Sequence, residues 1–334
     1  MIPNNNNINF NIDDIFGITN ETIFTKYALE IYHMQATKCE VYREYHTALK
    51  IDHNTINTLQ KIPFLPIEFF KSHKVIHDQQ AEEIIFTSSG TTGTINSKHY
   101  VSDVSLYEKS FIKGFEKFYG KIEDCCILAL LPNYYERTGS SLVYMVDYLI
   151  KKSNNKNSGF YLQNLDELNT MILHLEGTQQ NTILIGVSFA LLDLLQKNKY
   201  QLQHVRIMET GGMKGKRKEL LKSELQKILC AGFGKDEIDS EYGMTELLSQ
   251  AYSKASGIYD TVPWMKVLMR DVNDPFTILP IGYTGGINII DLANYYSCSF
   301  IATQDLGRQL GNESFEILGR FDNSDIRGCN LLIE

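Results

Sequence analysis

Eight residues in the first third of the chain concentrate hydroxyl groups and glycines in a way that suits the binding of an anion. The stretch Thr87–Thr94 has the sequence Thr-Ser-Ser-Gly-Thr-Thr-Gly-Thr and follows the apolar run Ile84–Phe86. Glycines let the backbone approach a ligand closely, and N–H and hydroxyl groups can surround a phosphate. A Walker A loop is excluded, because no Gly-Lys-Ser/Thr follows the second glycine. A flexible surface loop is the alternative interpretation. The candidate phosphate-binding residues are Ser88, Ser89, Gly90, Thr91, Thr92 and Gly93.

Three further stretches combine residue types that could bind a nucleotide. Thr210–Met213 holds two glycines, against which a flat ring could lie. Ser240–Glu246 combines an aromatic ring, a glycine, a hydroxyl and a carboxylate, which suits a base, a phosphate and Mg²⁺. Thr303–Arg308, followed by Gly319–Asp322, supplies an Asp for ribose hydroxyls and an Arg for a phosphate. Each stretch alone also fits an ordinary turn, but at the carboxyl ends of strands in an open α/β sheet all four would adjoin one ligand.

The elements that must position these stretches alternate between strand and helix. Such alternation implies βαβ units and a largely parallel sheet, so the predicted fold class is α/β. The apolar runs predict strands over residues 82–86, 127–131, 182–187 and 205–209. Helices are predicted from 103 to 118, from 140 to 150, up to 196, and from 216 to 229.

The two ends of the chain differ from this middle part. Periodic apolar residues predict an amphipathic helix over residues 22–48, and the Pro-containing segment 62–67 should pack that region onto the next part of the chain. After residue 252 the helical period is lost, which predicts a β-rich part. We expect one domain over 1–334, with a helical N-terminal region (1–75), an α/β nucleotide-binding core (76–252) and a β-rich part (253–334).

Composition narrows the class of protein. A formal net charge of −8 leaves no basic stripe for nucleic acid. The six cysteines are scattered without a CxxC pair, which fits neither a zinc site nor a secreted disulfide framework. The sequence contains neither a signal peptide nor an apolar run long enough to span a membrane. A soluble, cytoplasmic protein is therefore expected.

Taken together and in order, the four stretches resemble the adenylate-forming superfamily of acyl- and aryl-CoA ligases, luciferase-like enzymes and adenylation domains. The hydroxyl-rich loop resembles the family's Ser/Thr-Gly-Thr-Thr-Gly signature, and Tyr242-Gly243-Met244-Thr245-Glu246 matches its Tyr-Gly-x-Thr-Glu motif. Residues 303–308 are similar to Thr-Gly-Asp-Leu-x-Arg, with Gln304 in place of glycine, and 319–322 to the Gly-Arg-x-Asp hinge. The family's Pro-Lys after the phosphate loop is missing, and Lys98 is displaced, so no contact is assigned to it.

The end of the sequence narrows the resemblance. Members normally continue past the hinge into a small C-terminal domain with a catalytic lysine, whereas this sequence ends 12 residues after Asp322. We therefore expect the large N-terminal domain of the superfamily without that small domain. The size, the helical start and Cys329 near the terminus resemble the acyl-protein synthetases of bacterial bioluminescence. Such enzymes activate a fatty acid with ATP, carry it as a thioester on a cysteine and pass it to a reductase. An inert terminal cysteine is the alternative for Cys329.

The resemblance implies ATP and Mg²⁺ as cofactors and carboxylate activation as the chemistry, with acyl-AMP and pyrophosphate as products. It implies Thr245 at the α-phosphate, Glu246 on Mg²⁺, Asp305 on the ribose, Arg320 on the ribose or a phosphate, and Cys329 as acyl acceptor. An adenine pocket is expected from Gly211, Gly212 and Tyr242, with Gly243 and Met244 beside the nucleotide. The acid pocket is expected to include part of residues 131–142, with Tyr134, Tyr135 and Arg137.

Two other hypotheses stay open from the sequence. CoA, rather than Cys329, would be the acceptor in a ligase of the acyl- or aryl-CoA type. A non-catalytic subunit that binds nucleotide and a partner enzyme is the other. A partner that accepts the acyl group, either a reductase or a carrier protein, belongs to the acyl-protein synthetase interpretation.

Overall fold

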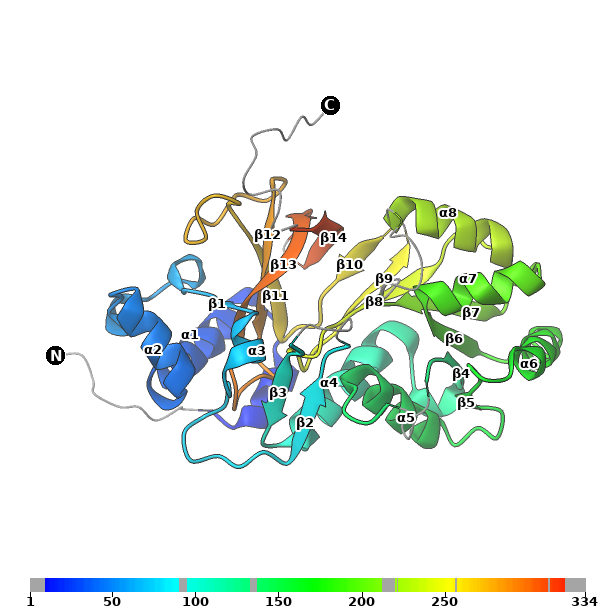
Figure 1. The fold of residues 1–334 in the computed structure, drawn as a ribbon, viewed down its shortest axis with the longest axis horizontal. Coiled ribbons are helices and arrows are strands. Elements are labelled where there is room, and N and C mark those ends of the chain that lie inside the picture. The colour runs from blue at the N-terminus through cyan, green and yellow to red at the C-terminus, as the bar shows by residue number, and fades with distance from the viewer. Residues whose placement is uncertain are drawn as a thin grey trace.

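The helical signal at the start of the chain produces two helices. The computed structural model describes residues 10–89, 95–132, 137–211, 220, 222–255, 257–311 and 313–321 (Figure 1). Helices α1 (Glu21–Lys38) and α2 (Glu40–Ala48) meet at Cys39, whose backbone is extended (φ −104°, ψ 109°). Cys39 forms an isolated antiparallel bridge with His77. The single helix predicted over 22–48 is therefore wrong at that residue, because the bridge requires backbone that leaves the helix.

The segment after these helices is extended, as predicted, but it pairs with a distant strand and not with the next part of the chain. Strand β1 (Leu65–Pro66) pairs in parallel with Ile301 and Ala302 of β13 (Phe300–Gln309), and α3 (Phe69–Ser72) follows it. The buried Gln35 of α1 reaches the same region. Its amide nitrogen donates to the carbonyls of Asn294 and Tyr295 and to the Ser299 hydroxyl, and its oxygen accepts from the Ser299 N–H.

Among the described residues, one sheet has 12 strands, and its strands between residues 126 and 242 pair in parallel, as predicted. Residues 126–130 and 182–187 in this half are apolar runs that are buried on both faces, which is typical of a parallel sheet. Helices α4 and α5 lie on one side of the sheet and α7 and α8 on the other (Figure 1). The strands are β4 (Cys126–Leu130), β5 (Gly159–Phe160), β6 (Thr182–Val187), β7 (Val205–Thr210) and β8 (Asp239–Tyr242). The helices are α4 (Val104–Tyr119), α5 (Ser141–Ser153), α6 (Leu165–Gly177), α7 (Ser188–Lys197) and α8 (Lys222–Phe233).

Most of these helices and strands lie where the sequence predicts them. Asp103 caps α4 as predicted, with its carboxylate accepting from the N–H of Ser105 at 3.0 Å. Helix α6 and strands β5 and β8 were not predicted as elements. Helix α8 ends four residues later than expected, at Phe233 instead of Leu229.

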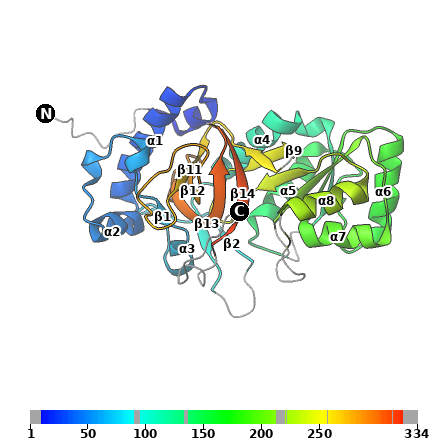
Figure 2. The same ribbon diagram turned by 90° about the horizontal axis from the view of Figure 1, so that it is seen from above.

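The second half of the sheet is antiparallel, except where β1 pairs with β13, and it lies between the N-terminal helices and the α/β half (Figure 2). The sheet as a whole is therefore mixed. The proposed divisions of the chain at residues 75 and 252 stay a prediction. The strands of this half are β9 (Ala251–Ala255), β10 (Ile258–Asp260), β11 (Met265–Arg270), β12 (Thr284–Asp291), β13 and β14 (Ser314–Arg320).

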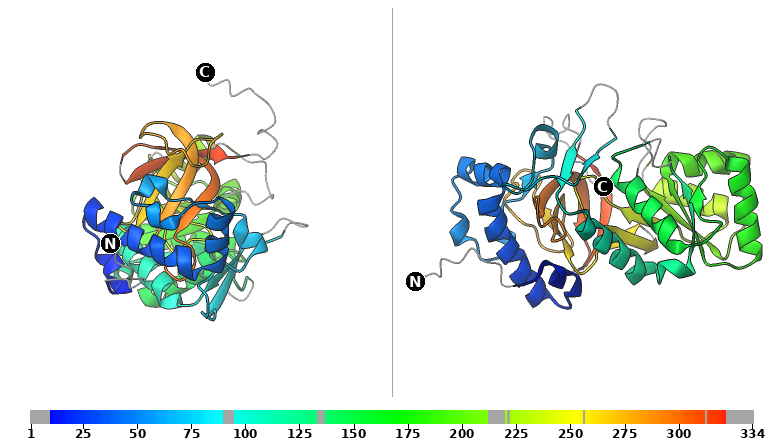
Figure 3. Two further views of the ribbon diagram at one scale, coloured as in Figure 1. Left: turned by 90° about the vertical axis from the view of Figure 1, so that its left-hand side faces the viewer. Right: turned by 90° about the horizontal axis from the view of Figure 1, so that it is seen from below.

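The hydroxyl-rich loop belongs to a separate hairpin. Strand β2 (Ile84–Thr87) pairs antiparallel with β3 (Lys98–Val101) in a sheet of two strands. This hairpin stands between the N-terminal helices and the α/β half (Figure 3). The prediction that this loop follows a strand of the main sheet is therefore wrong, and β3 was missed.

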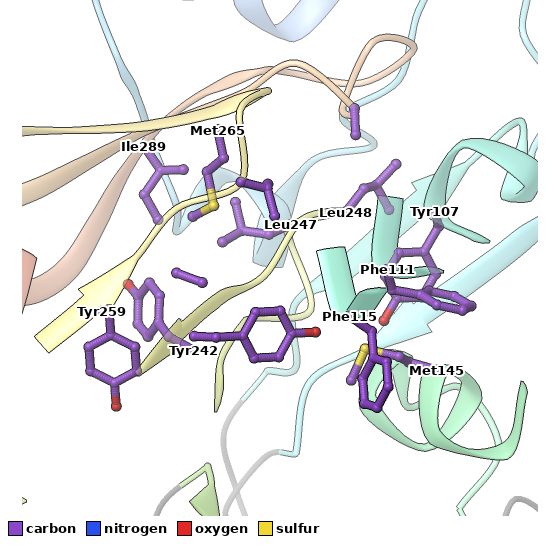
Figure 4. Close-up of a cluster of buried hydrophobic side chains, with 14 of the residues drawn as sticks. Tyr107, Phe111, Phe115, Met145, Tyr242, Leu247, Leu248, Tyr259, Met265 and Ile289 are labelled. Carbon is purple, nitrogen blue, oxygen red and sulfur yellow. The ribbon is translucent and has the colours of Figure 1, made fainter. Parts of the chain in front are cut away.

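A continuous apolar core underlies both halves of the sheet. Aromatic residues of α4, among them Phe111 and Phe115, pack toward Met145 of α5 (Figure 4). Tyr242 at the end of β8 and Leu247 in the loop that follows lie in the same cluster. The loop after β8 is thus anchored in the core by its apolar residues.

Candidate nucleotide-binding site

Three side chains that lie far apart in the sequence meet at the end of β8. The Tyr242 hydroxyl donates to the Asp305 carboxylate at 2.8 Å. Arg320 Nε lies 3.4 Å from the other oxygen of that carboxylate, because Asp305 and Arg320 are register partners on β13 and β14. Burial raises the pKa of Asp305, whereas the hydrogen bond from Tyr242 and the charge of Arg320 lower it. The Arg320 side chain is 73% exposed, so it is accessible to a ligand.

The structure corrects two expectations about this cluster. Residues 303–308 lie inside β13 and do not form a turn. The Tyr242 ring is only 8% exposed and packs against Tyr259 and Phe315, with ring centroids 5.8 and 5.6 Å away. In this arrangement Tyr242 orients Asp305 through its hydroxyl.

Thr245 and Glu246 lie in the loop after β8, against strand β3 of the hairpin. His99 Nδ1 lies 2.9 Å from the Thr245 carbonyl oxygen, and the Ser97 hydroxyl hydrogen-bonds to the Glu246 carboxylate. Ser97 and His99 are buried and Lys98 between them is exposed, as expected from the alternation of side chains along a strand. The hairpin thus brings Ser97 to Glu246, and Ser97 also bonds to Ser88 at the start of the hydroxyl-rich stretch.

The Glu246 carboxylate is buried and lies within the electrostatic influence of two positively charged side chains. Its side chain is buried, with 6% of the residue exposed, and burial raises its pKa. The Ser97 hydroxyl and the positive charges of Lys71 and Arg320 act in the opposite direction. Among the described residues, no group of three or more His, Cys, Asp or Glu side chains could hold a metal alone. A Mg²⁺ ion that binds through one carboxylate and substrate phosphates fits this composition.

The loop after β8 is also held from behind by the turn after β12. The Asp291 carboxylate accepts from the N–H groups of Leu248 and Ser249 at 2.8 and 2.9 Å, and from the Ser249 hydroxyl. The Asn294 amide donates to the Glu246 carbonyl at 2.8 Å. These contacts leave the backbone on both sides of Glu246 with fixed partners.

The turn after β7 contains a second buried polar group. The Glu209 carboxylate accepts from the Ser188 hydroxyl and pairs with Lys222 at the start of α8. The same hydroxyl oxygen lies 3.1 Å from the carbonyl oxygen of Gly211, so its single proton is shared between this carbonyl and Glu209. The φ of Gly211 is +68°, a backbone conformation that favours glycine, and Ser188 thus contacts the first residue of the turn in which a flat ring was expected.

A second carboxylate lies beside this group, on β8. The Thr210 hydroxyl donates to Glu241, and burial raises the pKa of Glu241 to about 7. A Cβ on Gly243 would stand 2.4 Å from Glu241 Oε1, so the glycine of the Tyr-Gly-x-Thr-Glu motif lies directly over this carboxylate.

Part of the predicted site lies outside the described residues. Besides the residues discussed above, Ser88, Ser89, Gly211, Gly243 and Met244 are described among those expected to bind nucleotide. The Ser88 hydroxyl accepts from the N–H of Ser97 at 2.9 Å. For the expected acid pocket, only the half-buried Arg137 is described among its named side chains. Those outside are Gly90, Thr91, Thr92, Gly93, Gly212, Cys329, Tyr134, Tyr135 and Asp322.

Sequence reasoning missed the side chains that support the site. For Ser97 and His99, the available signal was their position on either side of Lys98, which fits a strand. The two buried positions of such a strand are usually apolar, whereas here they hold polar residues. For Asp291 and Asn294, the signal was a carboxylate at the end of an apolar strand. Neither signal identifies a partner, because the residues that they contact lie at least 42 positions away.

The sequence matches the family described as acyl-protein synthetase, LuxE, over residues 15–334. The chain belongs to this family. The resemblance to the acyl-protein synthetases is thereby confirmed. No curated protein sequence matches the chain.

Solved structures place the LuxE family chain in the adenylate-forming fold. ATP-bound MatB from Rhodopseudomonas palustris matches with a TM-score of 0.53 at 20% identity, over 73% of this chain and 49% of that chain. An open conformation of 2-hydroxyisobutyryl-CoA ligase with 2-HIB-AMP and CoA matches with a TM-score of 0.63 at 10% identity, over 90% and 70%. MenE from Bacillus subtilis with AMP matches with a TM-score of 0.50 at 16% identity, over 74% and 51%.

At these identities the likeness establishes the fold, which confirms the predicted α/β class. The chain spans about half the length of MatB and MenE. In the described part of the chain, no helix has both the length and the apolar character needed to cross a bilayer.

Proposed function

We propose that this LuxE family chain uses ATP and Mg²⁺ to convert a carboxylic acid, with a fatty acid as the first candidate, into an acyl-adenylate. The observation that carries the proposal is the chain of contacts from Tyr242 through Asp305 to Arg320, placed beside the buried Glu246. These contacts bring together a bidentate acceptor (Asp305), an exposed cation (Arg320) and a candidate metal ligand (Glu246). Family membership and the adenylate-forming fold support it.

Each of these groups has a role that its surroundings favour. Asp305 would accept from the two ribose hydroxyls, with Tyr242 holding its orientation. Arg320 is exposed enough to turn from Asp305 toward a phosphate. Thr245 would contact the α-phosphate, and the hydroxyl-rich loop would surround the β- and γ-phosphates. Because the reactants are all anionic, such positioning and charge compensation would supply most of the rate enhancement.

The metal would be held by Glu246 together with phosphate oxygens of the nucleotide. Its chemistry would be to neutralise charge on the phosphates as the carboxylate attacks the α-phosphorus. Glu246 would have to be ionised to bind it. The hydrogen bond from Ser97 and the nearby Lys71 and Arg320 favour that form.

The test is isotope exchange of pyrophosphate into ATP over a panel of carboxylic acids, with saturated fatty acids of several chain lengths and small aryl acids. The expected result is exchange that depends on one class of acid and on Mg²⁺. Intact ATP binding without exchange for any acid would favour a non-catalytic subunit and overturn the proposal.

For the acyl acceptor we propose Cys329. The other five cysteines all have a raised pKa, because burial disfavours the thiolate, and four of them are buried. Cys298, in particular, is fully buried in β-rich surroundings, so it is a poor substitute. In the transfer step, the Cys329 thiolate would attack the acyl carbon, form a thioester and release AMP.

Labelled acid with ATP and Mg²⁺ should leave label on the wild-type protein that neutral hydroxylamine removes. Cys329→Ser should abolish this label but keep pyrophosphate exchange, because adenylation precedes transfer. Cys230→Ser, at the half-exposed thiol of α8, is the matched control and should keep the label. No label in the wild type, together with acyl-CoA formation when CoA is supplied, would overturn the assignment of Cys329 and make CoA the acceptor.

A further inference from the structure

Strand β13 contains extra residues at the place where it carries Asp305. Strands β11, β12 and β13 are neighbours in the sheet (Figure 1). Gly286 and Asn288 are two positions apart on β12, whereas their register partners on β13 (residues 306 and 302) are four apart. The three residues Thr303–Asp305 therefore lie opposite the single residue Ile287, which makes a β-bulge. A bulge changes the direction in which a side chain leaves a strand, and here that side chain is the candidate ribose acceptor.

The guanidinium group of Arg270, on β11, binds both sides of this bulge. Its Nη1 donates to the carbonyl of Ile287 at 2.8 Å and to the side-chain oxygen of Asn288 at 2.9 Å. Its Nη2 donates to the carbonyl of Thr303 at 2.5 Å. A bulge interrupts the backbone hydrogen bonds between two strands, and one side chain here supplies donors to carbonyls of both strands. The planar fork of an arginine suits such a set of acceptors.

Gly286 leaves the space that this guanidinium occupies. It is the register partner of Arg270 on β12. A Cβ added to Gly286 would stand 2.6 Å from Arg270 Cζ and 2.8 Å from Arg270 Nε, so the guanidinium lies directly against the glycine backbone. The ring of Phe321 packs against the same group, with its centroid 5.4 Å from Arg270 Cζ, a distance typical of a cation–π contact. Any side chain at Gly286 would thus displace the guanidinium.

The remaining polar groups of the bulge also have fixed partners. The Thr303 hydroxyl donates to the Ile287 carbonyl at 2.9 Å and accepts from the N–H of Asp305 at 3.1 Å. The carbonyl of Gln304 accepts at 2.8 Å from the N–H of the first residue after β14. Burial raises the pKa of Asp305, and the positive charge of Arg270 is among the groups that lower it. Arg270 therefore acts on Asp305 both through the backbone and through its charge.

We propose that Arg270 is a positioning residue for nucleotide binding, because its guanidinium holds the bulge Thr303–Asp305 in the shape that presents the Asp305 carboxylate to the ribose. This inference rests on the proposed function, which assigns Asp305 to the ribose hydroxyls. Arg270 itself does not touch the nucleotide in this arrangement. Its contribution is the direction in which Asp305 leaves the strand.

Three substitutions separate the donor geometry from charge and bulk. Arg270→Met removes the charge and every donor, whereas Arg270→Lys keeps the charge and loses the planar fork. Gly286→Ala keeps the arginine and places a methyl group where the guanidinium lies. The matched control is Arg206→Met on β7. That arginine also pairs within the sheet, with Asp239 at 3.1 Å, and also lies over an aromatic ring, that of Tyr119.

The first measurement is the Kd of ATP and of 2′-deoxy-ATP by calorimetry with Mg²⁺, together with Tm. The wild type should bind ATP about tenfold more tightly, because Asp305 loses one hydroxyl partner in the deoxynucleotide. In Arg270→Met, Arg270→Lys and Gly286→Ala the two Kd values should agree to within about twofold. Arg206→Met should keep the wild-type ratio whatever its Tm. A wild-type ratio in Arg270→Met, or its recovery in Arg270→Lys, would overturn positioning by the guanidinium fork.

The second measurement does not require a nucleotide. Compared with the wild type, a crystal structure of Arg270→Met should show the Asp305 carboxylate displaced and its hydrogen bond with Tyr242 lost. Gly286→Ala gives the same comparison if Arg270→Met does not fold. An unmoved Asp305 would overturn the inference. If the wild type binds both nucleotides equally, the assignment of Asp305 to the ribose fails, and the crystal structures still decide whether Arg270 shapes the bulge.

Discussion

In the parallel half of the sheet, the candidate residues follow the strands in loops, whereas in the antiparallel half Asp305 and Arg320 lie within strands. Thr245 and Glu246 need outside partners, and they obtain them from Ser97, His99 and the turn after β12. Asp305 and Arg320 need few partners from other elements, because the pairing of β13 with β14 sets the distance between them. A loop can change its conformation when the ligand changes shape during the reaction, whereas two paired strands hold their side chains at a fixed separation. Under the proposed function, the loops would hold the reacting phosphates, whereas the strand pair would hold the ribose through Asp305 and present Arg320 to the ribose or a phosphate.

The largest effect is expected at the loop residue Glu246. Glu246→Gln removes the charge at nearly constant shape, so exchange should fall by about 100-fold or more, chiefly in kcat, if the carboxylate holds Mg²⁺. The measurement is exchange kinetics over a range of Mg²⁺ concentrations. Glu44→Gln, an exposed position on α2, is the control. Wild-type kinetics in Glu246→Gln would return this residue to a structural role and remove the main contrast between the halves.

A smaller effect, of a different kind, is expected at the strand residue Asp305. Asp305→Asn keeps one oxygen as an acceptor for Tyr242 but loses the charge opposite Arg320 and one ribose acceptor. KM for ATP should rise by about tenfold with a smaller change in kcat. Asp236→Asn, at an exposed acid, serves for comparison. A loss mainly in kcat would mean that the strands also act on the transition state.

Removal of the Tyr242 hydroxyl tests how rigid the strand pair is by itself. Tyr242→Phe keeps the ring between Tyr259 and Phe315 and deletes only the hydrogen bond to Asp305. Since one such bond contributes about 1 kcal/mol, KM for ATP should rise about fivefold. An unchanged KM would indicate that pairing of β13 with β14 alone orients Asp305.

The smallest effect on activity is expected at Glu241, which affects stability instead. Its pKa in the folded protein is about 7, above the ordinary value of a glutamate. The stability that it contributes is therefore complete below about pH 4.3 and is lost as the pH rises through 7. As the pH rises over this range, the free energy of unfolding of Glu241→Gln should increase relative to that of the wild type, by up to about 3 kcal/mol. Denaturant unfolding at several pH values checks this, and parallel pH curves for the two proteins would contradict it.

The alternation of strands and helices in the middle of the chain was predictable because it depends on local apolar periodicity. Runs such as 182–187 are buried along their whole length and have few alternatives to a strand. Strand β13 was not predictable in this way. Its buried positions include Thr303 and Asp305, so the side chains that would signal a strand are polar.

The candidate site was predictable only as a set of separate stretches. Motif resemblance named Tyr242, Glu246 and Asp305, but the sequence gives no means to pair Tyr242 with a residue 63 positions later. Whether Tyr242 presents its ring or its hydroxyl to the site depends on Tyr259 and Phe315, which come from two other strands. The supporting residues His99 and Asn294 were missed for the same reason, since their roles exist only through tertiary contacts.

The pairing of β1 with β13 also sets a schedule for folding during synthesis. Leu65 must wait for Ile301, which is 236 residues farther along the chain. At a synthesis rate of about 5–20 residues per second, that wait lasts about 10–50 s. For most of this interval, the hydrogen-bond partners of Gln35, which include Asn294 and Ser299, have not yet been synthesised. Strand β13 is also not yet present beside α1 and α2. The N-terminal helices are thus synthesised well before β13, the strand that pairs with the segment that follows them.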